Sequence, residues 1–137
     1  VGDAAQFHKP AGVALSPDGG ALFVADFGNH KVRRVEVATG AVTTIAGGGS
    51  LGSADGVGSA AQFANSCGVA ISPDGSALFV ADSCNHKIRR VEVATCAVTT
   101  VAGSGEGGSA DGVGGAAEFY HPAGIALSPD GGALFVT

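Results

Sequence analysis

Short apolar runs separated by turn-forming residues follow one another along the whole chain. In the first unit of this pattern the runs cover 12–16, 21–25, 31–37 and 41–46. Ser16-Pro17-Asp18-Gly19 lies between the first two runs, and it favours a tight turn because Pro presets φ and Gly accepts a positive φ. The third run alternates partly between apolar and charged residues. The pattern therefore predicts four β-strands joined by short hairpins.

The same pattern returns with an offset of 56 residues. The sequence Gly-Val-Ala-Leu-Ser-Pro-Asp-Gly at 12–19 recurs with small changes at 68–75 and 124–131, and residues 1–56 and 57–112 are identical at 41 positions. A fixed period of this length indicates one supersecondary unit stacked on copies of itself. Residues 113–137 repeat only 1–25. We expect a piece of a longer array, with a small protein that assembles through its open ends as the alternative.

The composition fits a packed, strand-rich fold. Hydrophobic residues make up 45% and charged residues 14% of the chain, which argues against disorder. Four antiparallel strands per period, apolar on both faces, are typical of a propeller blade. We therefore predict an all-β fold of β-propeller blades, each of four antiparallel strands, in an incomplete ring. A β-solenoid and a β-sandwich are the alternatives, and the long and regular period disfavours both.

The motifs of each unit resemble those of NHL-repeat propellers. In the first unit they are Pro10-Ala11-Gly12-Val13-Ala14, Leu22-Phe23-Val24-Ala25-Asp26 and Asn29-His30-Lys31-Val32-Arg33. In the second they are Gly68-Val69-Ala70, Leu78-Phe79-Val80-Ala81-Asp82 and Asn85-His86-Lys87-Ile88-Arg89, and Ser66-Cys67 departs from the pattern. The resemblance implies an NHL-type propeller segment over 1–137. Its expected parts are blades at 11–48 and 67–104, a partial blade at 123–137, and linkers at 1–10, 49–66 and 105–122.

Charge and hydropathy exclude two classes of partner. The formal net charge is −5, and the only arginines are Arg33-Arg34 and Arg89-Arg90, so the chain lacks the basic footprint of a nucleic-acid-binding protein. No apolar run in the sequence approaches the length of a membrane span. We expect no nucleic acid and no membrane insertion. The expected partners are other propeller blades of the same or a longer chain, together with a protein partner of unknown identity.

The resemblance implies a non-catalytic structural scaffold or protein-binding platform within a larger, extracellular protein. The alternative is part of a propeller-type lyase or hydrolase with its site at the axial mouth. Repetition favours the first function, because catalysis needs a unique and convergent set of groups. The motifs Ser53-Ala54-Asp55-Gly56 and Ser109-Ala110-Asp111-Gly112 have one carboxylate each, which is too few for a calcium site, and they predict Asp-Gly turns. We expect no catalytic residue, no metal and no cofactor.

Two sets of polar residues are candidates for sites. The first set recurs in both units, and we predict that it forms a structural turn held by its own side chains: Asp26, Asn29, His30, Asp82, Asn85 and His86. The second set lies just before the inner strands and differs between units: His8, Tyr120 and His121. The counterpart of His8 in the second unit is Ala64. We interpret the second set as candidate binding residues, with neutral sequence drift as the alternative.

All three cysteines lie in the second unit, at Cys67, Cys84 and Cys96, where the first unit has Gly or Ala. A hairpin that turns at Asp74-Gly75 places Cys67 and Cys84 at one end of the blade and Cys96 about 20 Å away at the other. We predict a Cys67–Cys84 disulfide, which would imply an oxidising, extracellular compartment. Three free thiols at positions sized for Gly and Ala are the alternative.

Overall fold

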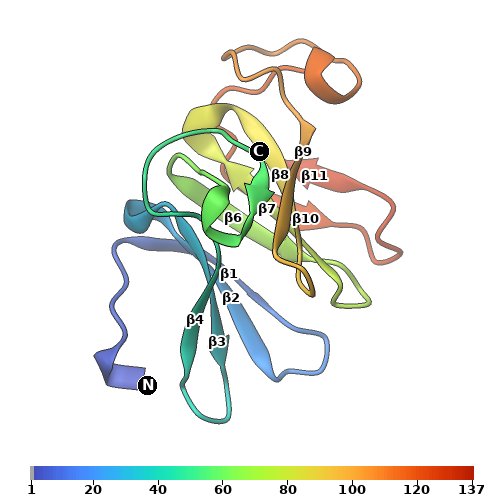
Figure 1. The fold of residues 1–137 in the computed structure, drawn as a ribbon. Helices are drawn as coiled ribbons and strands as arrows, with labels where there is room; N and C mark the ends of the chain where they lie inside the picture. Colours follow the sequence, from blue (N-terminus) through green and yellow to red (C-terminus); the bar gives the residue numbers. More distant parts are fainter. Residues whose placement is uncertain (1) are drawn as a thin grey trace.

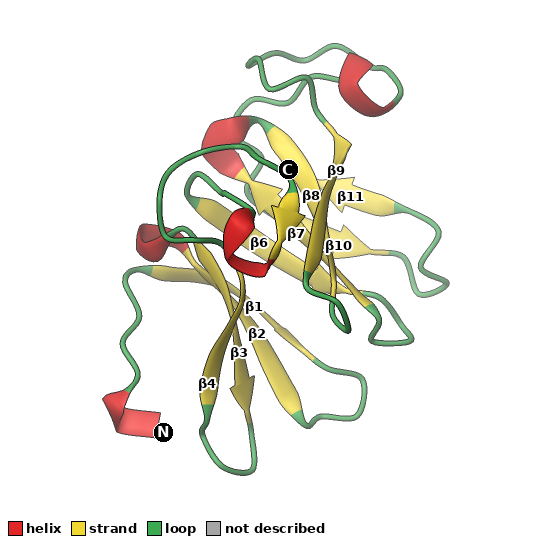
Figure 2. Cartoon of the chain, in the orientation of Figure 1, coloured by secondary structure: helices red, strands yellow, loops and turns green. Residues whose placement is uncertain are grey.

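The computed structural model describes residues 2–137, which form three antiparallel β-sheets arranged side by side (Figures 1 and 2). The described residues include five single-turn 3-10 helices: η1 (Gly2–Ala4) precedes the first strand, and η2 (Phe27–Asn29), η3 (Gly58–Ala60), η4 (Ser83–Asn85) and η5 (Gly114–Ala116) lie in the connections. Over this described range no helix is long and apolar enough to cross a membrane. The predicted all-β fold is confirmed.

The first sheet, called blade 1, has the four strands expected from the first unit. They are hydrogen-bonded in the order of the sequence: β1 (Pro10–Leu15), β2 (Ala21–Asp26), β3 (Lys31–Glu36) and β4 (Val42–Ala46). All neighbours are antiparallel, as short hairpins require. Strand β1 is the innermost, because it packs against the first strand of the following sheet.

The second sheet, blade 2, repeats this arrangement and adds a fifth strand. Its order is β5-β9-β8-β7-β6: β5 (Gly56–Val57), β6 (Ser66–Ile71), β7 (Ala77–Asp82), β8 (Lys87–Glu92) and β9 (Ala97–Ala102). Strand β5 comes from the segment expected to be a linker, which leaves blade 1 and reaches the outer edge of blade 2 (Figure 1). The linker therefore ties the two units together by pairing with β9.

The third unit forms a two-stranded sheet, called half-blade 3, from β10 (Ile125–Leu127) and β11 (Leu134–Val136). Each of its strands is three residues long, whereas the equivalent strands of blades 1 and 2 have six. Strand β10 lies against β6, in the same relation that β6 has to β1.

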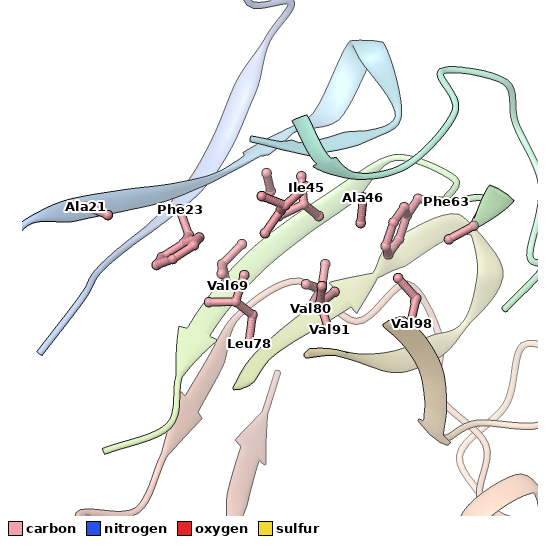
Figure 3. Close-up of a cluster of buried hydrophobic side chains, with 13 residues drawn as sticks. Ala21, Phe23, Ile45, Ala46, Phe63, Val69, Leu78, Val80, Val91 and Val98 are labelled. Carbon is pink, nitrogen blue, oxygen red and sulfur yellow. The ribbon is translucent and has the colours of Figure 1, made fainter. Parts of the chain in front are cut away.

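The hydrophobic core lies between blades and not within one of them (Figure 3). Blade 1 contributes Phe23 and Ile45, and blade 2 contributes Leu78 and Val91 from the facing side. Phe63, from the linker, is fully buried among them. A face of a sheet is therefore buried only where a second sheet packs against that face.

The inner strands approach so closely that two positions require glycine. A Cβ atom at Gly12 would overlap the carbonyl oxygen of Cys67, and one at Gly68 would overlap the carbonyl oxygen of Ala123. The N–H of Gly68 donates a hydrogen bond of 2.8 Å to that same oxygen. The glycine at the third position of β1 and of β6 is thus the point of backbone contact between successive units.

The Ser-Pro-Asp-Gly turns at the other end of the inner strands are held by their own side chains. In blade 2 the Ser72 hydroxyl donates to Asp74 Oδ1 at 2.6 Å, and both the N–H and the hydroxyl of Ser76 donate to the same oxygen. These bonds, that of Ser72 foremost, lower the pKa of Asp74 from 3.8 to about 2. Blade 1 has Gly20 in place of Ser76 and so lacks the third donor.

Replacement of Gly12 by Ala tests the close approach of the inner strands. We expect Gly12→Ala to lower the free energy of unfolding by about 1–3 kcal/mol, the cost of overpacking a rigid contact. Gly115→Ala is the matched control, because a Cβ there meets no atom within 4 Å. Chemical denaturation measures both variants. If the two variants were equally stable, the inner strands would not be held in close contact at Gly12.

Ser76→Gly converts the turn of blade 2 to that of blade 1. The loss of a donor should raise the pKa of Asp74 from about 2, while the remaining bonds keep it below 3.8. Because folding lowers the pKa of Asp74, this carboxylate stabilises the fold above pH 3.8, and the stabilisation is lost as the pH falls toward 2. In the Ser76→Gly variant this loss should be complete at a higher pH, because the folded-state pKa is higher. NMR titration of the carboxyl carbons measures it, with Asp18 as the internal reference. An unchanged Asp74 titration would contradict the assignment.

Candidate functional site

A buried carboxylate lies at the turn between the second and third strands of each blade. In blade 2 this group is Asp82, whose side chain is fully buried. Its Oδ1 accepts from the N–H of Ala64 at 2.8 Å, and its Oδ2 accepts from the Asn85 amide and from Arg89, each at 2.7 Å. Burial raises the pKa of Asp82, and these three donors oppose that rise. The carboxylate therefore joins the turn, the third strand and the entry to the inner strand.

Blade 1 repeats the arrangement around Asp26. The N–H of His8 and the amide of Asn29 each donate to it at 2.8 Å, and Arg33 donates at 3.0 Å. The predicted structural turn thus contains a residue that we did not assign to it, the arginine of the third strand. A sequence signal existed, because Arg-Arg within one strand places one guanidinium on each face, and one face of a blade is buried.

Arg89 connects the buried carboxylate to the linker. Its side chain is 0% exposed, and Nη1 also donates to the carbonyl of Gln62 at 2.9 Å. Nη2 donates to Asp55 Oδ1 at 2.8 Å, and the guanidinium lies over the ring of Phe63, 5.1 Å from its centre. Two carboxylates and a ring therefore surround a cation that has no exposed surface.

Asp55 was expected only to form an Asp-Gly turn, and the structure gives it a wider role. Besides the ion pair with Arg89, its carboxylate accepts from the N–H and the hydroxyl of Thr100 at 3.1 and 3.0 Å. Partial burial raises the pKa of Asp55, but the bonds from Arg89 and Thr100 outweigh it, so the pKa is lowered. The linker carboxylate thus holds the start of β5 against β9.

The repeated histidines connect one unit to the next. His30 and His86 end their turns with φ of 54°, in the left-handed region. The Nδ1 of His30 accepts from the N–H of Asn65 at 3.3 Å, and that of His86 accepts from the N–H of His121 at 3.0 Å. Each histidine therefore fixes the backbone just before the inner strand of the following unit, in addition to closing its own turn.

The residues that donate these bonds, Asn65 and His121, and their counterpart in the first unit have an unusual backbone conformation. Lys9, Asn65 and His121 occupy equivalent places before the three inner strands, and their φ values are 52°, 56° and 50°. A left-handed conformation costs a residue other than Gly about 1 kcal/mol or more, so neighbouring bonds must maintain it. We call the residues at 8–9, 64–65 and 120–121 the entry rim. It combines a repeated, fixed backbone with side chains that differ from unit to unit.

Two of the predicted binding residues meet at this rim, and the third lies apart. The rings of Tyr120 and His86 stack with centres 5.6 Å apart, and His121 contacts each of them edge to face at 4.7 Å. Tyr120 is 74% exposed. His8 instead packs on blade 1, where a Cβ at Gly28 would overlap its imidazole. The structure therefore unites Tyr120 and His121 with a member of the repeated set.

Within residues 2–137 the predicted Cys67–Cys84 disulfide is absent, and all three cysteines are free thiols. A β-bulge at the start of β6 places Ser66, and not Cys67, opposite Asp82. The Cys67 Sγ is directed toward the carbonyl oxygen of Asn65 at 3.6 Å, and burial raises the pKa of its thiol. The disulfide prediction is therefore wrong, and it no longer supports an oxidising compartment.

No metal centre is assembled by the part of the chain that the structure describes, since no three His, Cys, Asp or Glu side chains are grouped to hold an ion. The chemistry available is that of hydrogen bonding, ring stacking and charge. The Asn and Arg side chains of the repeated turns already donate to the buried Asp carboxylates, and the exposed side chains at the entry rim are free to contact a partner.

Removal of the buried cation tests the network. We expect Arg89→Met to lower the free energy of unfolding by about 3–5 kcal/mol, because it leaves the Asp82 carboxylate buried without its cation. Arg90→Met is the matched control: Arg90 is partly exposed and pairs with Glu92 at the surface, so its loss should cost about 1 kcal/mol or less.

Thermal and urea denaturation measure both variants. A double variant, Asp82→Asn with Arg89→Met, should recover part of the loss, since it removes the unpaired charge. Equal effects at Arg89 and Arg90 would contradict the account.

Comparison with known proteins agrees with the repeated motifs. The NHL repeat profile matches residues 7–35. Protein SUPPRESSOR OF QUENCHING 1, chloroplastic, from Arabidopsis thaliana is 34% identical over 138 residues, which are 95% of this chain and 13% of that protein. NHL repeat-containing protein 2 from Bos taurus is 35% identical over 142 residues, which are 96% of this chain and 20% of that protein. The chain thus spans a fifth or less of these curated relatives.

Solved structures share the arrangement of blades. An auxiliary nutrient binding protein from Bacteroides thetaiotaomicron superposes with a TM-score of 0.77 and 25% identity, over 90% of this chain and 33% of that one. In sequence and in fold, this chain corresponds to a propeller segment of the kind found in larger proteins. Residues 7–35 of this chain match the NHL repeat, and the relatives that the chain resembles over its whole length include NHL repeat-containing proteins.

Proposed function

We propose that this segment is a non-catalytic scaffold whose entry rim is a protein-binding platform within a larger protein. One observation carries the proposal: the repeated polar residues are bonded to each other and to the backbone, whereas the exposed side chains of the rim differ from unit to unit. Asp82 and Arg89 are both buried within this network. Tyr120, by contrast, is 74% exposed on a backbone that His86 holds in place.

The cavities at the opposite end of the strands support a structural role over an enzymatic one. A cavity of about 290 Å³ lies between the turns of blades 1 and 2, and one of about 310 Å³ lies between those of blade 2 and half-blade 3. Every residue that lines the second cavity lies 56 positions after one that lines the first, as Arg90 does after Arg34 and Asp74 after Asp18. Catalysis needs a group set that occurs once, and these cavities repeat.

The arrangement of the rim suits protein recognition. Binding surfaces profit from side chains that are already ordered, because association then costs less conformational entropy. Tyr120 and His121 are restrained by their mutual ring contacts and by the bond from the His121 N–H to His86. Exposed aromatic rings on a rigid base are enriched among residues that dominate binding energy.

A test compares rim variants with a variant of the supporting turn. The double variant Tyr120→Ala with His121→Ala removes the exposed side chains, and His30→Ala removes an acceptor in a different junction. We expect His30→Ala to cost about 1 kcal/mol of stability, the value of one hydrogen bond, with unchanged binding. The rim variant should lose binding and keep the wild-type melting temperature.

Binding is measured as quantitative capture from an extract of the cells that produce the protein, by mass spectrometry. Val113→Ala is the surface control, because Val113 is 90% exposed and precedes η5, which packs on β9. Proteins retained by wild type, His30→Ala and Val113→Ala but lost with the rim variant support the proposal. Equal capture by all four proteins, or a catalytic turnover that disappears with the rim variant, would contradict it.

A further inference from the structure

The second unit departs from the first most densely at one place, the entry to blade 2. Residues 57–112 differ from residues 1–56 at 15 positions. Six of these differences lie just before β6, at its start and in η4. They are Ala64, Asn65, Ser66, Cys67, Ser83 and Cys84, where the first unit has His, Lys, Pro, Ala, Phe and Gly. Neutral drift would spread the differences along the unit, so their concentration indicates a function specific to this place.

These residues come together because the turn of blade 2 packs on its inner strand. Helix η4 contacts β6, and the N–H of Cys84 donates to the carbonyl of Ala64 at 3.0 Å. The Cys67 Sγ lies 3.6 Å from the carbonyl oxygen of Asn65. The two cysteines, which we call the thiol pair, thus lie against consecutive carbonyl groups of one short segment. Strand β6 packs between β1 and β10, so neighbours on both sides fix this position.

The space for Cys84 is made by a second substitution. Its counterpart in blade 1 is Gly28, where a Cβ atom would overlap the imidazole of His8. The second unit has Ala64 in the place of that histidine, and the loss of the imidazole leaves room for the Cys84 side chain. Cys84 is exposed and Cys67 is half-buried. The fold therefore accommodates the thiol pair and leaves it accessible from solvent through Cys84.

The two thiols influence each other electrostatically. Burial raises the pKa of the Cys67 thiol, hydrogen bonding to Ser83 opposes the rise, and the negative charge of Cys84 adds to it. Such repulsion indicates that the two sulfur atoms are neighbours, because the interaction of charges falls with distance. Two thiolates that repel one another are stabilised together by a cation bound between them.

A further polar group beside the thiol pair is unused. The Ser66 side chain is 0% exposed, and its hydroxyl has no hydrogen-bond partner among residues 2–137. The equivalent residues, Pro10 and Pro122, carry no side-chain donor. A buried hydroxyl without a partner is unfavourable and calls for a functional explanation. The residue before Cys67 thus carries a free donor of the kind that stabilises a thiolate.

The number and type of these ligands select one class of ion. Thiolates are soft ligands, which favour Cu(I), zinc and iron–sulfur centres. Structural zinc takes four ligands, and the described residues group no three His, Cys, Asp or Glu side chains. A monovalent d10 ion such as Cu(I) is satisfied by two thiolates in a nearly linear arrangement. The thiol pair offers that number.

We propose that Cys67 and Cys84 bind one Cu(I) ion as a two-coordinate site at the entry to blade 2. Each sulfur forms a bond to the ion as its S–H bond breaks, and the two protons pass to the solvent. The oxidation state of the metal does not change. The site goes beyond the scaffold function and uses neither Tyr120 nor His121, so the two proposals stand or fall separately.

The test titrates the whole chain, reduced and free of oxygen, with Cu(I) in competition with bicinchoninate, whose colour reports the copper that it retains. We expect one ion bound and two protons released per chain. Cys67→Ala and Cys84→Gly restore the residues of the first unit. Each should weaken binding by about 100-fold or more, since the loss of an outer-shell contact alone costs about 10–100-fold. Cys96→Gly is the matched control, because it removes a thiol at a turn where φ is 61° and should leave the affinity unchanged.

The melting temperature of each variant without metal shows whether its fold is kept. If a reversion lowers it, alkylation of the exposed Cys84 in folded Cys96→Gly protein replaces that variant and should abolish binding. The proposal is overturned if either reversion or the alkylated protein binds copper as tightly as wild type, or if Cys96→Gly weakens binding by the same factor. It is also overturned if copper joins two chains in sedimentation, because the exposed Cys84 of two copies would then be the ligands.

Discussion

The structure depends on the fact that a four-stranded blade is apolar on both faces and cannot bury them alone. Phe23 and Ile45 of blade 1 become buried only because Leu78 and Val91 of blade 2 lie against them. Stability therefore resides in the junctions between units, as expected of repeat architectures in which each unit contacts its neighbours. The close approach at Gly12, the docking of Phe63 and the added strand β5 all serve this contact.

Polar groups connect the units where apolar packing ends. Arg89 bonds the buried Asp82 of its own blade and the Asp55 of the linker, and His30 holds the entry of the following unit through Asn65. Because the bonds to Asp55 and to Asn65 cross a boundary between segments, they fix the position of one blade relative to the next. The side chains of the entry rim, which differ between units, are therefore attached to a backbone whose position is fixed. This connects the fold to the proposed binding function.

Most of the fold could be predicted from the sequence, because the repeat makes the strand pattern visible more than once. The four strands of each blade, their order and the Ser-Pro-Asp-Gly turns follow from apolar runs and turn residues. The pairing of β5 with β9 could not be foreseen, since Gly56–Val57 is too short to be read as a strand. The disulfide prediction failed because a β-bulge, invisible in the sequence, shifted Cys67 by one position.

The candidate site was harder to predict, because its contacts join residues far apart in the chain. Asp26 and Asp82 were recognised as turn residues. Their partners Arg33 and Arg89 lie in the third strand of each blade, and the alternation of residues along that strand does not by itself show which of its faces is buried. Tyr120 and His121 were noted as unlike residues, whereas their contact with His86 depends on the packing of one unit on the next.

Native-state hydrogen exchange, resolved strand by strand, tests most directly whether stability resides in the junctions. Blade 2 is covered on both faces, blade 1 on one, and half-blade 3 lacks its outer strands. The account predicts the slowest exchange in β7 and β8, faster exchange in β2 and β3, and the fastest in β10 and β11. Equal protection of blades 1 and 2, despite their unequal coverage, would contradict it, because each blade would then be stable by itself.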